Sequence, residues 1–139
     1  MTYKKIFIES GIFTDTNDRE REYYDDSLNV LYYLIENSIH IYTSCSIIHT
    51  ILQKNDKNSA ISAIENISKF AKIVELSSLD VTKACRLIKE DKNYLSLEYT
   101  IEYILAKKAQ CKIILSNSND FYASDIKVIS ARNFGKDID

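Results

Sequence analysis

The chain contains little of what usually marks turns or cross-links a small protein. Its 139 residues include no proline, no tryptophan, two glycines, one methionine and three cysteines. Turns must therefore be marked by Asn, Asp and Ser, as in segments 55–58 and 116–119. The cysteines, Cys45, Cys85 and Cys111, are odd in number and far apart, which argues against a disulfide framework or a zinc knuckle. We expect each to be a small buried hydrophobe.

The chain also lacks a strong charge of one sign and a long apolar run. A net charge of -2 gives no overall attraction for nucleic acid, so RNA binding would have to rely on a local basic patch or on metal ions. No apolar run approaches the roughly 18 residues of a membrane span, and the N-terminal run is too short for a signal-peptide core. We expect a cytoplasmic protein without a membrane partner. The length and the 45% hydrophobic content suit one compact domain over residues 1–139.

Short β-rich runs alternate with amphipathic helical patterns along the chain. Strands are predicted at 4–8, 39–43, 72–76, 112–115 and 127–130. A loop is predicted after the first strand, followed by helices at about 20–37, 46–52 (capped by Ser44 or Ser46), 60–67, the segment after a cap at Ser78, and 94–108. Strands that alternate with helices predict a mainly parallel sheet covered on both faces, a three-layer α/β/α sandwich.

Acidic side chains follow two of the predicted strands. Glu9 comes directly after the first strand, and Asp120 lies in the loop after strand 112–115. Polar groups at the carboxyl ends of parallel strands gather in the crevice where such folds bind ligands. A two-metal nuclease needs three or four carboxylates that converge from separate elements. Glu98, on the predicted helix 94–108, would supply a third.

Two acids on that helix are candidates for the carboxylate that lies near the sheet. Glu98 and Glu102 are four residues apart, so both can face the same direction. The predicted inward-facing stripe consists of Leu97, Ile101, Ile104 and Leu105. Glu98 falls at the edge of this stripe. Glu102 is a weaker, fourth candidate for a metal ligand. The alternative for every acid is an ordinary solvent-exposed carboxylate, because most charged side chains lie at the surface.

Several short segments resemble the PIN domain, a nuclease fold often found as the toxin of toxin–antitoxin pairs. Residues 6–11 resemble the opening PIN strand followed by Asp-Thr/Ser-Asn, with Glu9 in place of the Asp and Gly11 in place of the Asn. Residues 98–106 are similar to the later PIN helix, in which an acid begins a run that ends in Ala. Residues 116–121 resemble the closing Thr-x-Asn/Asp-x-Asp-Phe loop. The similarity extends over nearly the whole chain.

The resemblance implies an endoribonuclease that cleaves single-stranded RNA with Mg²⁺ or Mn²⁺. It implies further that the protein is the toxin of a toxin–antitoxin pair, with an antitoxin protein as partner and a tendency to form homodimers. The implied catalytic and metal-binding residues are Glu9, Glu98 and Asp120, with Glu102 as a further metal ligand and Ser10, Ser116 and Ser118 in support.

Departures from the PIN pattern leave other hypotheses open. Segment 44–50 lacks the acid that many PIN nucleases carry after the second strand, and Glu replaces Asp at Glu9 and Glu98. An extra methylene in a ligand arm shifts a metal by roughly an ångström, which is enough to slow the reaction strongly. The second hypothesis is therefore a PIN-derived module that binds RNA or protein without cleaving. The third is an unrelated α/β domain whose acids are coincidental.

Overall fold

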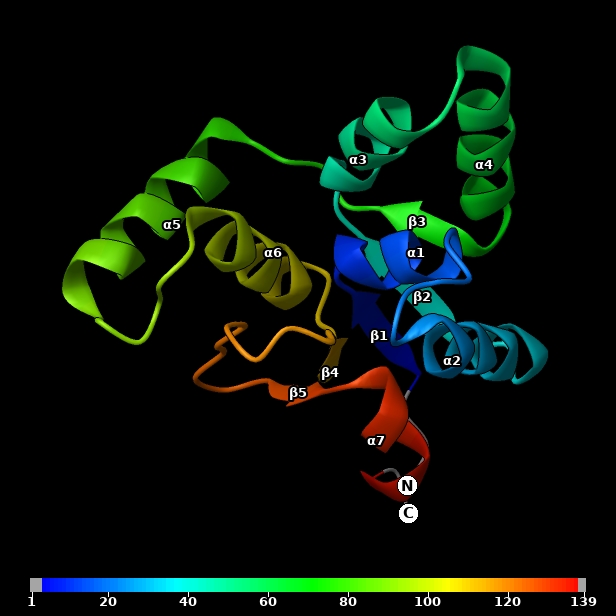
Figure 1. The fold of residues 1–139 in the computed structure, drawn as a ribbon. Helices are drawn as coiled ribbons and strands as arrows, with labels where there is room; N and C mark the ends of the chain where they lie inside the picture. The colour runs from blue at the N-terminus through cyan, green and yellow to red at the C-terminus, as the bar shows by residue number, and fades with distance from the viewer. Residues whose placement is uncertain (1–3, 138–139) are drawn as a thin grey trace.

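A five-stranded parallel sheet forms the centre of the computed structural model, which describes residues 4–137. The strands are β1 (Lys5–Ile8), β2 (His40–Thr43), β3 (Ala71–Ile73), β4 (Ile113–Leu115) and β5 (Lys127–Ile129), in the order β3-β2-β1-β4-β5. The helices are α1 (Ser10–Thr16), α2 (Tyr24–Glu36), α3 (Ser46–Lys54), α4 (Lys57–Phe70), α5 (Ser78–Glu90), α6 (Leu97–Lys108) and α7 (Ala131–Asp137). Helices cover both faces of the sheet, which confirms the predicted α/β/α class (Figure 1).

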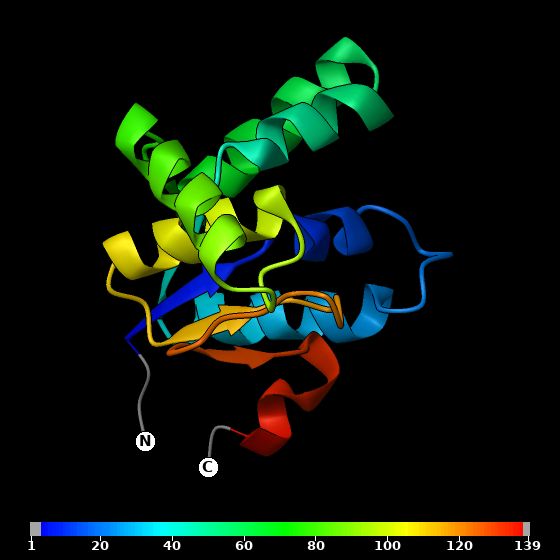
Figure 2. The same cartoon turned by 90° about the vertical axis from the view of Figure 1, so that its left-hand side faces the viewer.

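Alternate residues of each inner strand enter different hydrophobic cores. Ile6 and Ile8 of β1 belong to the core on the side of α2 and α7, whereas Phe7 belongs to the core on the side of α5 and α6 (Figures 1 and 2). On β4, Ile113 and Ile114 divide in the same way. A strand buried on both faces needs a continuous apolar run rather than an alternating one. This requirement is why the short Ile-rich runs predicted the strands correctly.

The segment after β1 is a helix, and the loop predicted there is wrong. Glu9 is the N-cap of α1, and its side chain accepts a hydrogen bond from the Gly11 N–H. A carboxylate at this position satisfies one of the free N–H groups of the first turn, although Glu is not a residue typical of N-caps. The next helix, α2, begins at Tyr24, later than the predicted start near Glu20.

The cap of α5 is Ser77, not the predicted Ser78. The Asp80 N–H donates to Ser77 Oγ at 3.2 Å, and the Ser77 N–H donates to Asp80 Oδ2 at 2.9 Å. These reciprocal bonds form a capping box. Because the predicted cap is only one residue away, the helix that follows was still recognised.

The prediction of three buried cysteines is confirmed for one of them. Cys111 is buried, and burial raises the pKa of its thiol to about 12. Cys85 is half-buried, and Cys45 is exposed at the start of α3. Cys45 is also the N-cap of α3 and makes no side-chain capping bond, so neither Ser44 nor Ser46 caps this helix as predicted.

The buried face of α6 is rotated relative to the predicted stripe. Its buried residues are Thr100, Glu102, Tyr103, Leu105 and Ala106, while Leu97 is 45% exposed. Thr100 and Tyr103 can be buried because their hydroxyl groups donate to the Ser96 carbonyl at 2.6 Å and to Asp125 Oδ1 at 2.6 Å. The rotation carries Glu102 into the protein and leaves Glu98 outside.

Candidate active site at the carboxyl ends of the strands

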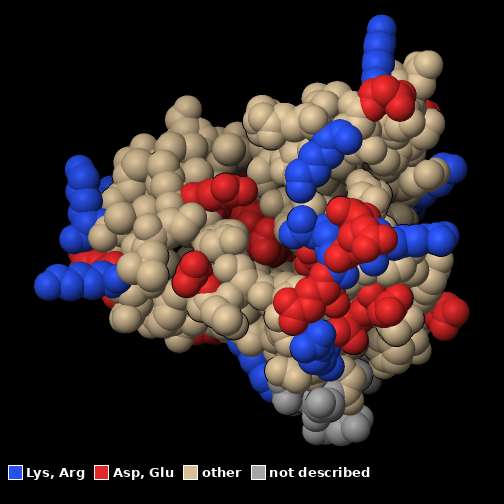
Figure 3. Space-filling view, in the orientation of Figure 1, with Lys and Arg blue, Asp and Glu red and all other residues tan. Residues whose placement is uncertain are grey.

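The crevice of this fold lies at the carboxyl ends of β1, β2 and β4. The chain runs from β1 through β2 to β3 and then crosses to β4 on the other side of β1, which creates a topological switch point. Glu9, Ser44 and Ser116 each directly follow one of these strands, and all three are buried. Acidic side chains occupy a hollow near the middle of the face seen in Figure 3.

Glu9 is held by hydrogen bonds to both oxygens of its carboxylate. Ser116 Oγ donates to Glu9 Oε1 at 3.0 Å, while the Ser10 hydroxyl (3.3 Å) and the Gly11 N–H donate to Oε2. Burial raises the pKa of Glu9 above its ordinary value despite these hydrogen bonds, and the charge of Glu98 raises it further. The carboxylate is therefore fixed in position but poorly solvated.

Gly11 leaves the space that this carboxylate occupies. A Cβ on residue 11 would lie 2.8 Å from Glu9 Oε2 and 2.9 Å from Oε1. Neither distance is compatible with an undisturbed Glu9 side chain, so any other residue type at position 11 displaces the carboxylate.

Glu102 is a second buried carboxylate in the same crevice. Its Oε1 accepts hydrogen bonds from Ser44 Oγ at 2.7 Å and from the Ser10 N–H at 3.3 Å. Its Oε2 is buried and has no hydrogen-bond partner among the described residues. Burial, and then the nearby charge of Glu9, raise the pKa of Glu102 to about 8. Ser10 thus bonds to both acids, through its hydroxyl and its N–H.

The donor set of Glu9 and Glu102 fits a divalent cation. A buried, unpartnered carboxylate oxygen beside a second carboxylate is costly unless a proton or a cation compensates the charge. Mg²⁺ is commonly bound by one or two carboxylates, several waters and a substrate phosphate. Within residues 4–137, no three His, Cys, Asp or Glu side chains are grouped closely enough to hold a metal ion. The arrangement therefore suits one ion completed by water and substrate, and not a ring of three or four protein acids.

The other two predicted acids lie outside this buried pair. Glu98 is exposed on the first turn of α6, where it lines a cleft of about 130 Å³ together with Glu102. Its charge raises the pKa of both Glu9 and Glu102, so it lies at the rim of the site. Asp120 is exposed in the loop after β4, and its N–H donates to Ser118 Oγ at 3.2 Å. In the described part of the chain, its carboxylate takes part in none of the hydrogen bonds or ion pairs.

Sequence comparison assigns the chain to a family. No family model matches it. The protein named Ribonuclease VapC1 from Aquifex aeolicus is 35% identical over 137 residues, which cover 96% of this chain and 95% of that protein. The chain belongs to the VapC family of PIN-domain proteins.

Solved structures of VapC and FitB proteins share the fold. VapC20 of Mycobacterium tuberculosis, described as a sarcin-ricin loop cleaving toxin, gives a TM-score of 0.64 at 12% identity, over 84% of this chain and 92% of that chain. VapBC2 of Rickettsia felis, bound to a DNA fragment from its promoter, gives a TM-score of 0.68 at 12% identity, over 91% of this chain and 98% of that chain. FitAcB of Neisseria gonorrhoeae gives a TM-score of 0.63 at 10% identity, over 91% of this chain and 97% of that chain. At these identities the likeness shows the PIN fold alone, and it confirms the predicted fold.

Ser44 is a contributor to this VapC site that the sequence reasoning missed. The sequence suggests Ser44 as a helix cap, whereas its hydroxyl donates to Glu102 Oε1 and lies 2.5 Å from Ser46 Oγ. Its position directly after β2 was the available signal, because the same placement after the first strand singled out Glu9.

Asn117 fixes the loop that begins with the buried Ser116, and no sequence signal indicated this role. Its Nδ2 donates to Asp15 Oδ2 at 2.8 Å and to Ser27 Oγ at 3.0 Å, and its Oδ1 accepts from the Ala131 N–H at 2.9 Å. Asp15 is itself buried and accepts from Arg21 Nε at 2.6 Å. The loop is thereby tied to α1, α2 and α7, which holds the donor of Glu9 in place.

Proposed function

We propose that this VapC-family protein is a divalent-cation-dependent endoribonuclease that cleaves single-stranded RNA as the toxin of a toxin–antitoxin pair. The observation that carries the proposal is the buried pair Glu9 and Glu102, whose unpartnered oxygen lies in the crevice of a PIN fold. The 35% identity to a protein named as a ribonuclease supports the reaction class. The sarcin-ricin loop named for the structural neighbour supports RNA as substrate.

In this proposal the two buried acids hold the ion, and the serines hold the acids. A bound Mg²⁺ or Mn²⁺ would supply an activated water and would stabilise negative charge on the scissile phosphate. Ser116 and Ser10 fix the Glu9 carboxylate, and Ser44 fixes Glu102, so that neither acid must reorganise during the reaction.

Glu98, Asp120 and Ser118 complete the proposed site from its rim. Glu98 adds negative charge at the mouth of the crevice, where it would attract the ion and hold one of its water ligands. Asp120 would act from its exposed loop on a water of the ion or on the substrate, and Ser118 braces this loop by accepting a hydrogen bond from the Asp120 N–H. Both are therefore expected to matter less to the rate than the buried pair.

A PIN-fold module that binds RNA or protein without cleaving is the second candidate function. The observation that favours it is the absence, within residues 4–137, of three metal-ligating side chains grouped together. In that case Glu102 would hold a proton instead of an ion, consistent with a pKa of about 8. The two functions differ in whether Mn²⁺ binds at the acidic pair.

The proposed partners are an antitoxin protein and a second copy of the chain, in the cytoplasm. The R. felis neighbour is a VapBC2 structure, which supports an antitoxin. On α2, Tyr32 is 57% exposed, Ile35 43% and Tyr33 41%, which provides an apolar surface for a protein contact. No helix within residues 4–137 is long and apolar enough to cross a membrane.

Cleavage of a labelled single-stranded RNA in Mn²⁺ or Mg²⁺ tests the proposal. We expect wild-type cleavage to be lost in EDTA and to fall at least about a hundredfold in Glu9→Gln, because the amide no longer offers a charged ligand. Asp120→Asn is expected to lower the cleavage rate less than Glu9→Gln does. Glu65→Gln, an exposed acid on α4, serves as the matched control and keeps the wild-type rate.

Two outcomes would contradict the proposed activity. Equal cleavage by wild type, Glu9→Gln and Asp120→Asn would assign the cleavage to a contaminant. No cleavage by a folded wild type in ample Mn²⁺, with no Mn²⁺ bound at the acidic pair, would favour the binding module.

A further inference from the structure

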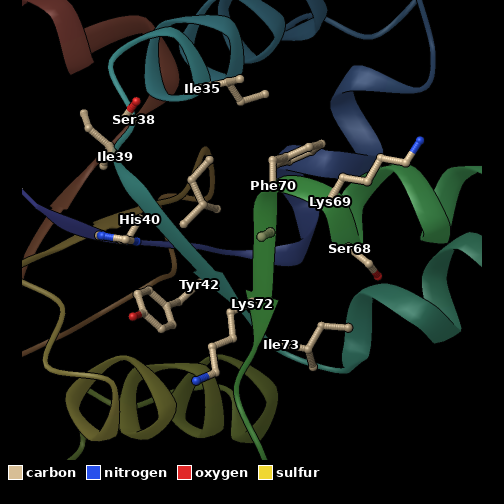
Figure 4. A pocket seen from close by; sticks show the side chains of 12 residues that line it. Ile35, Ser38, Ile39, His40, Tyr42, Ser68, Lys69, Phe70, Lys72 and Ile73 are labelled. Carbon is tan, nitrogen blue, oxygen red and sulfur yellow. The ribbon is translucent and has the colours of Figure 1, made fainter.

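A groove of about 740 Å³ crosses β2 and β3 at the edge of the sheet (Figure 4). Its lining includes His40, Tyr42, Lys69, Phe70, Lys72 and Ile73, and it includes no Asp or Glu. Because β3 is the outermost strand on this side, no further strand of the sheet closes the groove. The volume is typical of a ligand site, and the charged groups in its lining are all basic.

The register of the sheet brings the basic and aromatic side chains together. Tyr42 is the partner of Lys72 across β2 and β3, and Lys5 is the partner of His40 across β1 and β2. His40 and Tyr42 are two residues apart on one strand, so they lie on the same face of the sheet. Lys5 Nζ lies 5.6 Å from the centre of the Tyr42 ring. In Figure 4, the Tyr42 and Lys72 side chains extend in the same direction, toward the helix below them.

The cations of this groove are not neutralised by the rest of the described chain. The side chains of Lys72 and His40 are exposed, and within residues 4–137 neither side chain has a hydrogen-bond or ion-pair partner. Lys107, Lys108, Arg21 and Arg132, by contrast, are all paired with carboxylates. The groove therefore retains positive charge, and no acid in its lining offsets that charge.

The groove and the acidic crevice follow one another along the same two strands. The lining of the groove ends at Tyr42 and Ile73, and the lining of the cleft beside Glu102 begins at Ser44 and Leu76. His40 and Ser44 are four residues apart, which corresponds to about 13 Å along an extended strand. The groove and the crevice are therefore close enough for one single strand to reach both.

We propose that this groove binds the backbone of single-stranded RNA on one side of the scissile phosphate. Lys72 contacts a phosphate, His40 donates a hydrogen bond to phosphate or base, and Tyr42 offers a ring against which a base can stack. The inference rests on the proposed ribonuclease function for its substrate. It supplies the local basic patch that RNA binding by an acidic chain requires.

Charge complementarity selects RNA over a peptide strand as the occupant. The free edge of β3 could pair with a peptide, as exposed sheet edges do in other proteins. A neutral strand, however, would leave the charges of Lys69 and Lys72 without compensation, whereas the phosphates of RNA neutralise them. An acidic peptide is the competing occupant, and the test includes it.

The test measures the affinity of a labelled single-stranded RNA by fluorescence anisotropy in EDTA, where cleavage does not occur. We expect Lys72→Glu to raise Kd roughly tenfold and to lower the slope of log Kd against log salt by about 0.7, the value for one lost phosphate contact. The double variant Lys72→Glu/His40→Glu is expected to bind more weakly still. Lys92→Glu reverses the charge of an exposed lysine in the turn after α5 and is expected to retain the wild-type Kd.

The outcomes separate this inference from the proposed activity. If wild type binds RNA in this way but cleaves none, the groove is supported and the nuclease function fails. The inference is overturned if Lys72→Glu binds RNA as Lys92→Glu does, or if wild type binds no RNA. It is also overturned if Lys72→Glu weakens only the binding of a poly-glutamate peptide, because the groove then belongs to an acidic protein.

Discussion

Glu102→Gln is expected to stabilise the metal-free protein while it abolishes RNA cleavage. The amide keeps an oxygen that can accept from Ser44 and the Ser10 N–H, but it removes a negative charge that is buried beside Glu9. We expect the melting temperature in EDTA at about pH 8.5 to rise on the order of 10 °C, because burying an ionised carboxylate costs several kcal/mol in a chain of this size. The cleavage rate is expected to fall at least about a hundredfold because a metal ligand is lost.

The raised pKa of Glu102 determines whether the stability of the metal-free protein rises or falls with pH. The folded-state pKa of Glu102 is about 8, above the ordinary value of 4.5, so the folded protein holds a proton that the unfolded chain has already released. The stability of the metal-free wild type therefore falls as the pH rises from about 4.5 to 8. Glu9, whose pKa is also raised, acts in the same direction. Asp80, whose pKa Lys108 holds at about 2, contributes stability that is lost only below about pH 4, outside this window.

Thermal unfolding in EDTA across roughly pH 5 to pH 9 measures this effect. The difference in melting temperature between Glu102→Gln and wild type should be small at the acidic end of this pH range and largest at the alkaline end. Ser44→Ala is the control, since it removes a donor to Glu102 but leaves the charge. A wild-type stability that is flat or rises over this range, with no gain in Glu102→Gln, would show that the carboxylate is not buried as described.

Gly11→Ala is expected to lower the cleavage rate roughly a hundredfold without unfolding the protein. The new Cβ would lie 2.8 Å from Glu9 Oε2, so the carboxylate must leave its hydrogen bonds to Ser116 and Ser10. A displacement of about an ångström at a metal ligand is enough for a loss of this size. Gly135→Ala is the matched control, because a Cβ at Gly135 meets nothing within 4 Å.

The same geometry explains why two departures from the PIN pattern occur together. Glu9 stands where the pattern has Asp, and Gly11 stands where it has Asn. The additional methylene of Glu9 brings its carboxylate into the space that a side chain at position 11 would occupy. The double variant Glu9→Asp/Gly11→Asn should therefore recover much of the rate lost in Gly11→Asn alone. Full activity in Gly11→Ala, or no recovery in the double variant, would contradict this coupling.

The positions of the strands could be predicted from the sequence, but the orientation of α6 could not. The strands are short β-branched runs, and two of them are followed directly by residues of the site, Glu9 and Ser116. On α6, hydrogen bonds to the Thr100 and Tyr103 hydroxyls allow a polar face to be buried, while Leu97 is left exposed. Apolar spacing alone therefore indicated the wrong face and ranked Glu98 above Glu102.

The remaining features of the site depend on contacts between distant parts of the chain. Asn117 bonds to Asp15 and Ser27, which are 102 and 90 residues away. Glu102 Oε1 is held by Ser44, 58 residues away. Such pairs leave no periodic pattern in a single sequence, so they became visible only when the elements were placed in space.

Calorimetric titration of Mn²⁺ into the wild type and Glu102→Gln at about pH 7.5 tests the central claim, that Glu9 and Glu102 together hold a divalent ion. We expect one ion to bind to each wild-type chain, with release of protons that the buried pair holds at this pH, and we expect Glu102→Gln to bind at least about tenfold more weakly. Equal affinity in the two proteins, without proton release, would contradict the assignment of the ion to this pair.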